Sequence, residues 1–345
     1  MKRLYCILIL SALLLFSALF SSCTPEQVQN GDHNKTVIGV FIPGITSGSP
    51  IYEMLARGVL AAAEKYNIDA GAELVDVTVI EGGYNQAEWE NSITAMTASN
   101  LYDLIVSSNP SLPDIVTRIS ARFPDQYFLL LDGYLSGNPR VYTLRYNQRE
   151  QAYMAGYIAA LQTEASGTRR VVGLVAAQEY PVMNNIILPG YLEGARAVDP
   201  AYEADFRIVG NWFDAARAAE LTTDMILDGI RVVLTIAGSA NEGVVNTASQ
   251  RGIKVVWFDI NGYDIRPGTV IGSSVLYQDM AAFNKVLAYL SGILPFGSAE
   301  TAGVNYGYVD FIENDPVYIQ TVPAEIRERQ AVMIQRIRTG ELVLR

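Results

Sequence analysis

Carboxylate and aromatic side chains that suit recognition of a small ring compound lie at the ends of predicted strands. Asp132 and Asp259 each follow an apolar run directly, and Trp212 lies beside Asn211 after another. Carboxylates accept hydrogen bonds from vicinal hydroxyls such as those of a ribose, and a flat ring stacks on a flat base or sugar face. This combination predicts a site for a neutral polar ligand with a planar or ring-shaped part.

The loops around these positions add further polar candidates. Ser47 and Tyr52 follow the first predicted strand, Asn109 follows the third, and Gly238 lies in a small-residue loop after a later one. They offer hydroxyls, an amide and accessible backbone groups. The predicted ligand-binding residues are therefore Asp259, Trp212, Asp132, Gly238, Asn109, Tyr52 and Ser47.

Most of these residues also have a purely structural interpretation. Trp212 could belong to the core, as aromatic residues usually do. Asp132 and Asn109 could shape turns, since Gly133 and Pro110 follow them, and Tyr52 could pack at a helix start. Asp259 is the strongest candidate, because an acid directly after the apolar letters VVWF has few other reasons to be there.

The arrangements that catalysis usually needs are missing from the sequence. The only histidine, His33, lies in a polar segment before the first predicted strand, which argues against Ser-His-Asp, Cys-His and histidine-rich zinc sites. No nucleophile elbow, phosphate-binding loop or dinucleotide fingerprint is present. A carboxylate pair could still serve a hydrolase that acts on glycosides, so that alternative stays open. We expect a binding protein that is not an enzyme, with no cofactor and no metal.

The elements that position these residues follow an alternating pattern. Short apolar runs predict strands at residues 37–42, 75–80, 104–106, 127–131, 171–176, 206–209, 232–236 and 254–258. Helical periodicity lies between them at residues 51–66, 88–99, 114–122, 152–163, 190–197, 215–227 and 242–250. Such alternation predicts parallel sheets covered by helices on both faces.

The number of these units exceeds what one doubly wound domain needs. We therefore expect an α/β fold with two Rossmann-like lobes and a hinge, with the ligand beyond the carboxyl ends of the strands. Lobe 1 is expected to comprise residues 37–144 and 262–293, and lobe 2 residues 145–261 and 294–345.

Composition indicates a folded, globular protein. Half of the 345 residues are hydrophobic and 18% are charged, which is enough for a large core. The net charge is −11 and no long basic run exists, so a nucleic-acid partner is not expected. We expect a monomer.

The N-terminus has the pattern of an export signal. Lys2 and Arg3 precede an apolar stretch at residues 4–20, and small residues lead to Cys23. Residues 1–22 are predicted to be a signal peptide, and residues 23–36 a lipidated cysteine followed by a flexible tether. Because Cys6 lies within the signal, the mature chain would hold one cysteine, and acylation would explain a lone exported thiol. The alternative is a free cysteine at the cleavage site.

The letters FSSC at residues 20–23 resemble a bacterial lipobox, although phenylalanine replaces the usual leucine. In that motif the cysteine carries diacylglycerol, and lipoproteins of this kind also carry palmitate. The resemblance implies a protein anchored by lipid to the cell membrane, facing the periplasm or the exterior.

Several motifs resemble the basic-membrane-protein family of ABC-transporter solute receptors. They occur in the family's order as YNQREQAYMAG at residues 146–156, GYLEGA at 190–195, AGSANEG at 237–243, WFD at 257–259 and IRTGEL at 337–342. The similarity covers the chain from about residue 37 to its end. It implies the type I periplasmic binding protein fold, lobes that close around a purine nucleoside or related base, and ABC permease subunits as partners.

The resemblance also implies roles for individual residues. Asp132 would occupy the position of a family aspartate after the fourth strand, and Trp212 would stack on a base. Gly238 would bring backbone close to the ligand, and Asp259 would accept ribose hydroxyls.

Two departures leave the ligand open. The family's acidic pair in the first loop is replaced by Thr46 and Ser47, and a family lysine aligns with Leu276. A base or another less polar ring compound is therefore also plausible as ligand. A sensory or host-interaction lipoprotein without transport remains the functional alternative.

Overall fold

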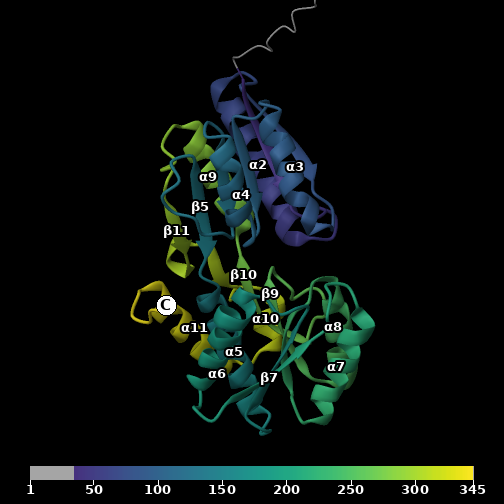
Figure 1. Ribbon diagram of the computed structural model, residues 1–345. Coiled ribbons are helices and arrows are strands. Elements are labelled where there is room, and N and C mark those ends of the chain that lie inside the picture. The colour runs from purple at the N-terminus through teal and green to yellow at the C-terminus, as the bar shows by residue number, and fades with distance from the viewer. Residues whose placement is uncertain (1–34, 345) are drawn as a thin grey trace, which may run out of the picture. The chain divides into compact units, whose positions relative to one another are not determined.

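Two helix-flanked sheets make up the part of the chain that the structure describes, which is residues 35–344 of a computed structural model (Figure 1). The predicted signal peptide, Cys23 and His33 lie outside the described residues. Within residues 35–344, no helix combines the length and the apolar character that crossing a membrane requires.

The first sheet has six parallel strands in the order β11-β5-β4-β3-β1-β2. They are β1 (Thr36–Ile42), β2 (Val75–Glu81), β3 (Leu104–Ser108), β4 (Tyr127–Leu131), β5 (Val141–Tyr146) and β11 (Ala299–Ala302). The helices that accompany this sheet in Figure 1 are α2 (Pro50–Ala70), α3 (Trp89–Ala98), α4 (Leu112–Arg122) and α9 (Gln278–Leu290). The central strands are buried along nearly their whole length, as expected of parallel strands covered on both faces.

The second sheet has the order β12-β10-β9-β8-β6-β7. Its strands are β6 (Val171–Ala176), β7 (Glu203–Ile208), β8 (Val232–Ile236), β9 (Lys254–Asp259), β10 (Val270–Leu276) and β12 (Val309–Phe311). Only β12, at the edge, pairs antiparallel. The longer helices of this half are α5 (Gln148–Ala165), α6 (Leu188–Arg196), α7 (Ala215–Leu227), α8 (Asn241–Arg251) and α11 (Ala324–Arg338), and α10 (Pro316–Thr321) is short.

The division of the chain between the two sheets differs from the expected one at two strands. We expected residues 262–293 in lobe 1, but β10 pairs with β9 and so belongs to the second sheet. We expected residues 294–345 in lobe 2, but β11 pairs with β5 in the first sheet. The reason is physical: β10 is buried throughout, and its local pattern does not reveal which strand it will pair with.

The chain therefore passes between the sheets three times, and hydrogen bonds link the crossing segments. The N–H of Asn147 donates to the Ala302 carbonyl at 2.8 Å, and the N–H of Tyr277 donates to the Tyr308 carbonyl at 3.0 Å. The N–H of Val304 donates to the Glu150 carboxylate at 2.8 Å. These bonds hold the three crossings together as one unit.

Candidate ligand-binding site

Two aspartates occupy equivalent places in the two sheets. Asp132 directly follows β4, and Asp259 is the last residue of β9. Both have left-handed backbone conformations, with φ of 53° and 72°. Besides them, Asn100 is the only non-glycine residue among the described ones with positive φ. Non-glycine residues that are held in this region are over-represented at ligand sites.

The two carboxyl groups are half-buried and interact with each other. Burial raises the pKa of Asp132 to about 7, and repulsion from the charge of Asp259 contributes to the increase. Burial also raises the pKa of Asp259 to about 6, although a hydrogen bond from Gln151 opposes that increase. Asp132 follows β4 of the first sheet and Asp259 ends β9 of the second, so this repulsion indicates that the carboxyl ends of the two strands face each other.

A buried glutamine holds one of these carboxylates. Gln151, in α5, has no exposed surface, and its Nε2 donates to Asp259 Oδ1 at 3.0 Å and to the Ser274 carbonyl at 3.1 Å. Its Oε1 is buried and has no hydrogen-bond partner. The hydroxyl of Tyr146, at the end of β5, is buried without a partner as well. Burial raises the pKa of Tyr146 well above its usual value, and the charge of Asp132 adds to this.

Tyr52 and Asn109 lie beside Asp132. The Asn109 Nδ2 donates to the Tyr52 hydroxyl at 3.3 Å. Burial raises the pKa of the Tyr52 hydroxyl, and the charge of Asp132 raises it further. The helix start of α2 and the loop after β3 thus both contribute polar groups to the edge that carries Asp132.

An aromatic pair lies beside Asp259. The rings of Trp212 and Tyr180 have centroids 6.3 Å apart with an interplanar angle of 41°. Burial and the charges of Asp259 and Asp132 raise the pKa of Tyr180. Trp212 is 43% exposed, so it is not a core residue, and its carbonyl accepts a hydrogen bond from the Ser239 hydroxyl at 3.1 Å.

Gly238 lies close against the backbone of Trp212. Its φ is 61°, and a Cβ at this position would lie 2.8 Å from the Trp212 carbonyl oxygen and 3.3 Å from an atom of the indole ring. A glycine is needed here because a side chain would displace the tryptophan.

The chain matches the family described as ABC transporter substrate-binding protein PnrA-like, or Bmp, over residues 35–342. It belongs to the Bmp family. This confirms the predicted family, and both the family and the fold are those of solute-binding proteins.

Two curated relatives have names that state a ligand. The ABC transporter nucleoside-binding protein BmpA of Lactococcus lactis is 26% identical over 165 residues, covering 48% of this chain and 43% of that protein. A purine-binding protein of Brucella abortus is 26% identical over 193 residues, covering 56% and 52%.

A solved structure supports the fold. The solute-binding protein of an ABC transporter system from Aeropyrum pernix superposes with a TM-score of 0.76 at 20% identity, covering 90% of this chain and 93% of that one. The predicted type I fold of periplasmic solute-binding proteins, with two parallel α/β sheets, is confirmed.

In this Bmp-family chain, six of the seven predicted residues lie around the carboxylate pair or the adjoining aromatic pair. Ser47 is different: it is exposed in the loop after β1, and no described hydrogen bond or charge interaction joins it to Asp132 or Asp259. Asp214 caps α7 by accepting the Arg217 N–H at 2.9 Å.

Sequence reasoning missed three residues of this site. Tyr180 follows β6, and the rule that ligand contacts follow strands should have found it. Tyr146 ends β5, a strand that was not predicted. Gln151 lies inside a helix, where only its polarity on a wholly buried face gives a signal.

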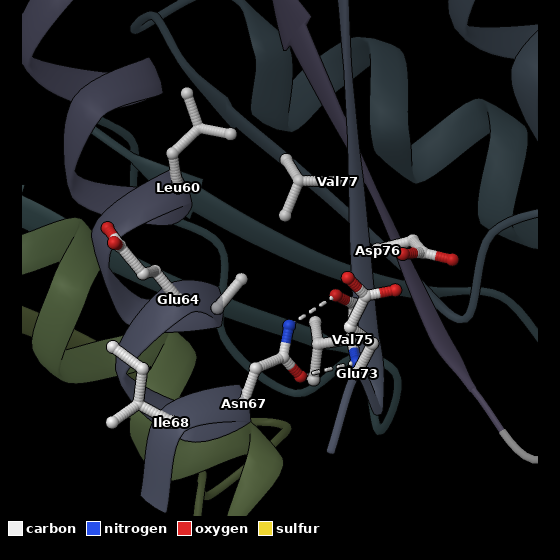
Figure 2. A pocket seen from close by; sticks show the side chains of 9 residues that line it. Leu60, Glu64, Asn67, Ile68, Glu73, Val75, Asp76 and Val77 are labelled. Carbon is white, nitrogen blue, oxygen red and sulfur yellow. Dashed lines mark hydrogen bonds between the residues drawn. The ribbon is translucent and has the colours of Figure 1, made fainter. Parts of the chain in front are cut away.

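A separate hollow lies between α2 and β2 (Figure 2). Asn67 bridges it, because Nδ2 donates to the Val75 carbonyl at 2.9 Å while Oδ1 accepts from the N–H groups of Leu74 and Val75. The amide thus has its bonding groups satisfied within the turn, so we assign Asn67 a structural role.

Proposed function

We propose that this protein is the substrate-binding lipoprotein of an ABC importer. It captures a small polar solute with a ring, such as a purine nucleoside or a related base, between its two α/β halves. The observation that carries the proposal is the coupling of Asp132 with Asp259 across the two sheets. A ligand held by both carboxylates would join the halves, as transport receptors of this fold require.

Each side of the site has a distinct role in this proposal. Trp212 and Tyr180 offer ring faces for stacking on a planar ligand. Asp259, oriented by Gln151, accepts hydrogen bonds from ligand hydroxyls, and Asp132 accepts them from the other end of the ligand. Gly238 allows the backbone near Trp212 to approach the ligand closely.

Closure is the step that links binding to transport. The three crossings between the sheets form the hinge, and ligand contacts in both halves favour the closed form. That form docks on the ABC permease subunits, and the protein acts as a monomer.

A lipid anchor at Cys23 would keep the receptor at the cell membrane, facing the periplasm or the exterior. Each buried methylene of an acyl chain contributes roughly 0.8 kcal/mol to membrane affinity. We expect the wild-type protein to take up radiolabelled palmitate and to fractionate with membranes. Cys23→Ser should prevent labelling, and persistent labelling of that variant would contradict the assignment.

A ligand screen tests the binding function. Purified full-length protein in mild detergent is heated with nucleosides, bases or sugars, and its unfolding midpoint is followed. A ligand at a hundredfold excess over its dissociation constant stabilises the fold by about 2.7 kcal/mol. We expect a clear increase with purine nucleosides or bases, and no turnover of the bound compound on chromatography. An unchanged midpoint with the whole panel would reject the proposal, and turnover would favour the hydrolase alternative.

A further inference from the structure

Among the described residues, the site around the two carboxylates has many hydrogen-bond acceptors and no basic side chain that affects either carboxyl group. Asp132 senses the charge of Asp259, and three tyrosines, Tyr52, Tyr146 and Tyr180, sense one or both of the aspartate charges. No lysine or arginine among the described residues contributes to either carboxyl group.

Two arginines that flank Tyr146 and Gln151 in the sequence are engaged elsewhere. Arg145 donates to the Thr301 hydroxyl at 3.1 Å and lies over the ring of Tyr134, 4.7 Å from its centroid. Arg149 forms an ion pair with Glu193 at 2.6 Å. Neither is available to neutralise the pair.

Gln151 adds a further acceptor that points to the same kind of ligand. Two acceptors, Asp259 Oδ1 and the Ser274 carbonyl, fix the orientation of its amide, because only the NH₂ group can donate to both. The other end of the amide must therefore be the oxygen, and this buried Oε1 has no donor. The partial negative charge of this oxygen, which no donor offsets, adds to the negative charge of Asp259.

Aromatic faces complete the environment that a cation prefers. Tyr180, which packs against Trp212, senses the charges of Asp259 and Asp132, and Tyr52 senses the charge of Asp132. A cation above such a ring is attracted by its electron-rich face, and the attraction is stronger when water is excluded.

We propose that the ligand of this site is a ring compound that carries a positive charge, recognised by Asp132, Asp259 and the aromatic rings. This inference rests on the proposed binding function and deepens it. The competing arrangement is a proton shared by the two carboxyls, which would neutralise one of them and leave the site suited to a neutral ligand.

Matched ligands that differ only in charge separate the two arrangements. Nicotinamide riboside has a permanently charged pyridinium ring, and benzamide riboside is its neutral carbon analogue. The second pair is 1-methylnicotinamide, whose ring is also permanently charged, and its neutral carbon analogue 3-methylbenzamide. Affinities are measured by calorimetry on the full-length protein in mild detergent at pH 8 and pH 5, in two buffers with different ionisation enthalpies to count protons.

We expect at least one charged member to bind roughly 10–100-fold more tightly than its neutral partner at pH 8. The preference should shrink at pH 5, where both carboxyl groups are more protonated, and Asp132→Asn should reduce it about tenfold at pH 8. The control is Asp103→Asn. Asp103 precedes β3 at the opposite end of the first sheet and accepts the Val37 N–H at 2.7 Å, which asparagine can still do. Asp103→Asn should leave the preference for the charged ligands unchanged.

Three results would overturn the cationic ligand. They are equal or tighter binding of the neutral members at pH 8, uptake of one proton with a neutral member, and the absence of binding by both charged members. The first two leave the proposed receptor function standing, because a solute still binds. Only an unresponsive screen of nucleosides, bases and sugars would reject the receptor function itself.

Discussion

Gln151 Nε2 lies 3.0 Å from Asp259 Oδ1 and joins helix α5 to the carboxyl end of β9. The glutamine has no exposed surface, whereas the aspartate is half-buried. The hydrogen bond therefore connects the interior of the second half to the group that we expect to meet the ligand. It both orients the carboxylate and lowers its pKa against the effect of burial.

Replacing Gln151 by leucine should weaken ligand binding. The hydrogen bond to a charged group contributes about 1.5–3 kcal/mol, so we expect the dissociation constant of the best ligand to increase roughly 10–100-fold. The pKa of Asp259 should rise further, and binding should therefore weaken most below neutral pH. Calorimetry between pH 5 and pH 8 measures both effects.

The chain provides a matched control for this substitution. Gln330 is also fully buried, its Nε2 donates to the Met154 carbonyl at 3.1 Å, and its Oε1 has no partner. Gln330→Leu should change the unfolding midpoint while leaving the dissociation constant within about twofold. If both variants lost affinity equally, Gln151 would have no specific role at the site.

The pKa of Asp132 predicts a dependence of stability on pH. It is about 7 in the folded protein, against about 4 for an unfolded chain, so folding favours the protonated carboxyl. Its stabilising contribution is fully present below about pH 4 and is lost as the pH rises through 7. Asp132→Asn removes this dependence and keeps the backbone, since asparagine tolerates positive φ.

The free energy of unfolding in urea, measured on the ligand-free protein, checks this linkage. Relative to the wild type, Asp132→Asn should gain about 1–2 kcal/mol between pH 5 and pH 8, less than the full shift would give because the group is partly solvated. Parallel pH profiles for the wild type and Asp132→Asn would contradict the raised pKa.

Much of the fold was predictable because burial and periodicity are local signals. The strands at residues 127–131, 171–176 and 232–236 and the helix at 215–227 were predicted with the bounds that the structure has. The short edge strands β11 and β12 were not, because four and three residues leave too little periodicity to detect. Assigning β10 required knowing its partner β9, which is a property of the whole fold.

Residues of the candidate site could be predicted where they directly follow strands, but not where they lie elsewhere in the chain. Asp132, Asp259 and Trp212 were predicted from the rule that ligands meet the carboxyl ends of parallel strands. The sequence could not show that the two aspartates would interact, since they come from different sheets. Nor could it show that Gln151 would contact Asp259, because their residue numbers differ by 108.

Trp212 should contribute to binding and little to stability. Its ring is 43% exposed, so Trp212→Ala removes a stacking surface without opening a core cavity. We expect an affinity loss of roughly 10-fold and an unfolding midpoint within about 2 °C of the wild type. Phe213→Ala removes the neighbouring ring, which is 74% exposed, and should retain affinity. If Trp212→Ala lost much stability and Phe213→Ala did not, the ring of Trp212 would instead have a structural role.

Gly238→Ala should disturb the site through the backbone of Trp212. The added Cβ would lie 2.8 Å from the Trp212 carbonyl oxygen, a distance that forces one of the two segments to move. Gly252→Ala is the control, because its φ of 71° resembles the 61° of Gly238 and nothing lies within 4 Å of its Cβ position. Both alanines lose about 1–2 kcal/mol to left-handed backbone strain. We expect only Gly238→Ala to weaken ligand binding, by roughly 10-fold or more, and to shift the tryptophan emission. Comparable affinities of the two variants in calorimetry would show that the position of Trp212 does not matter for binding.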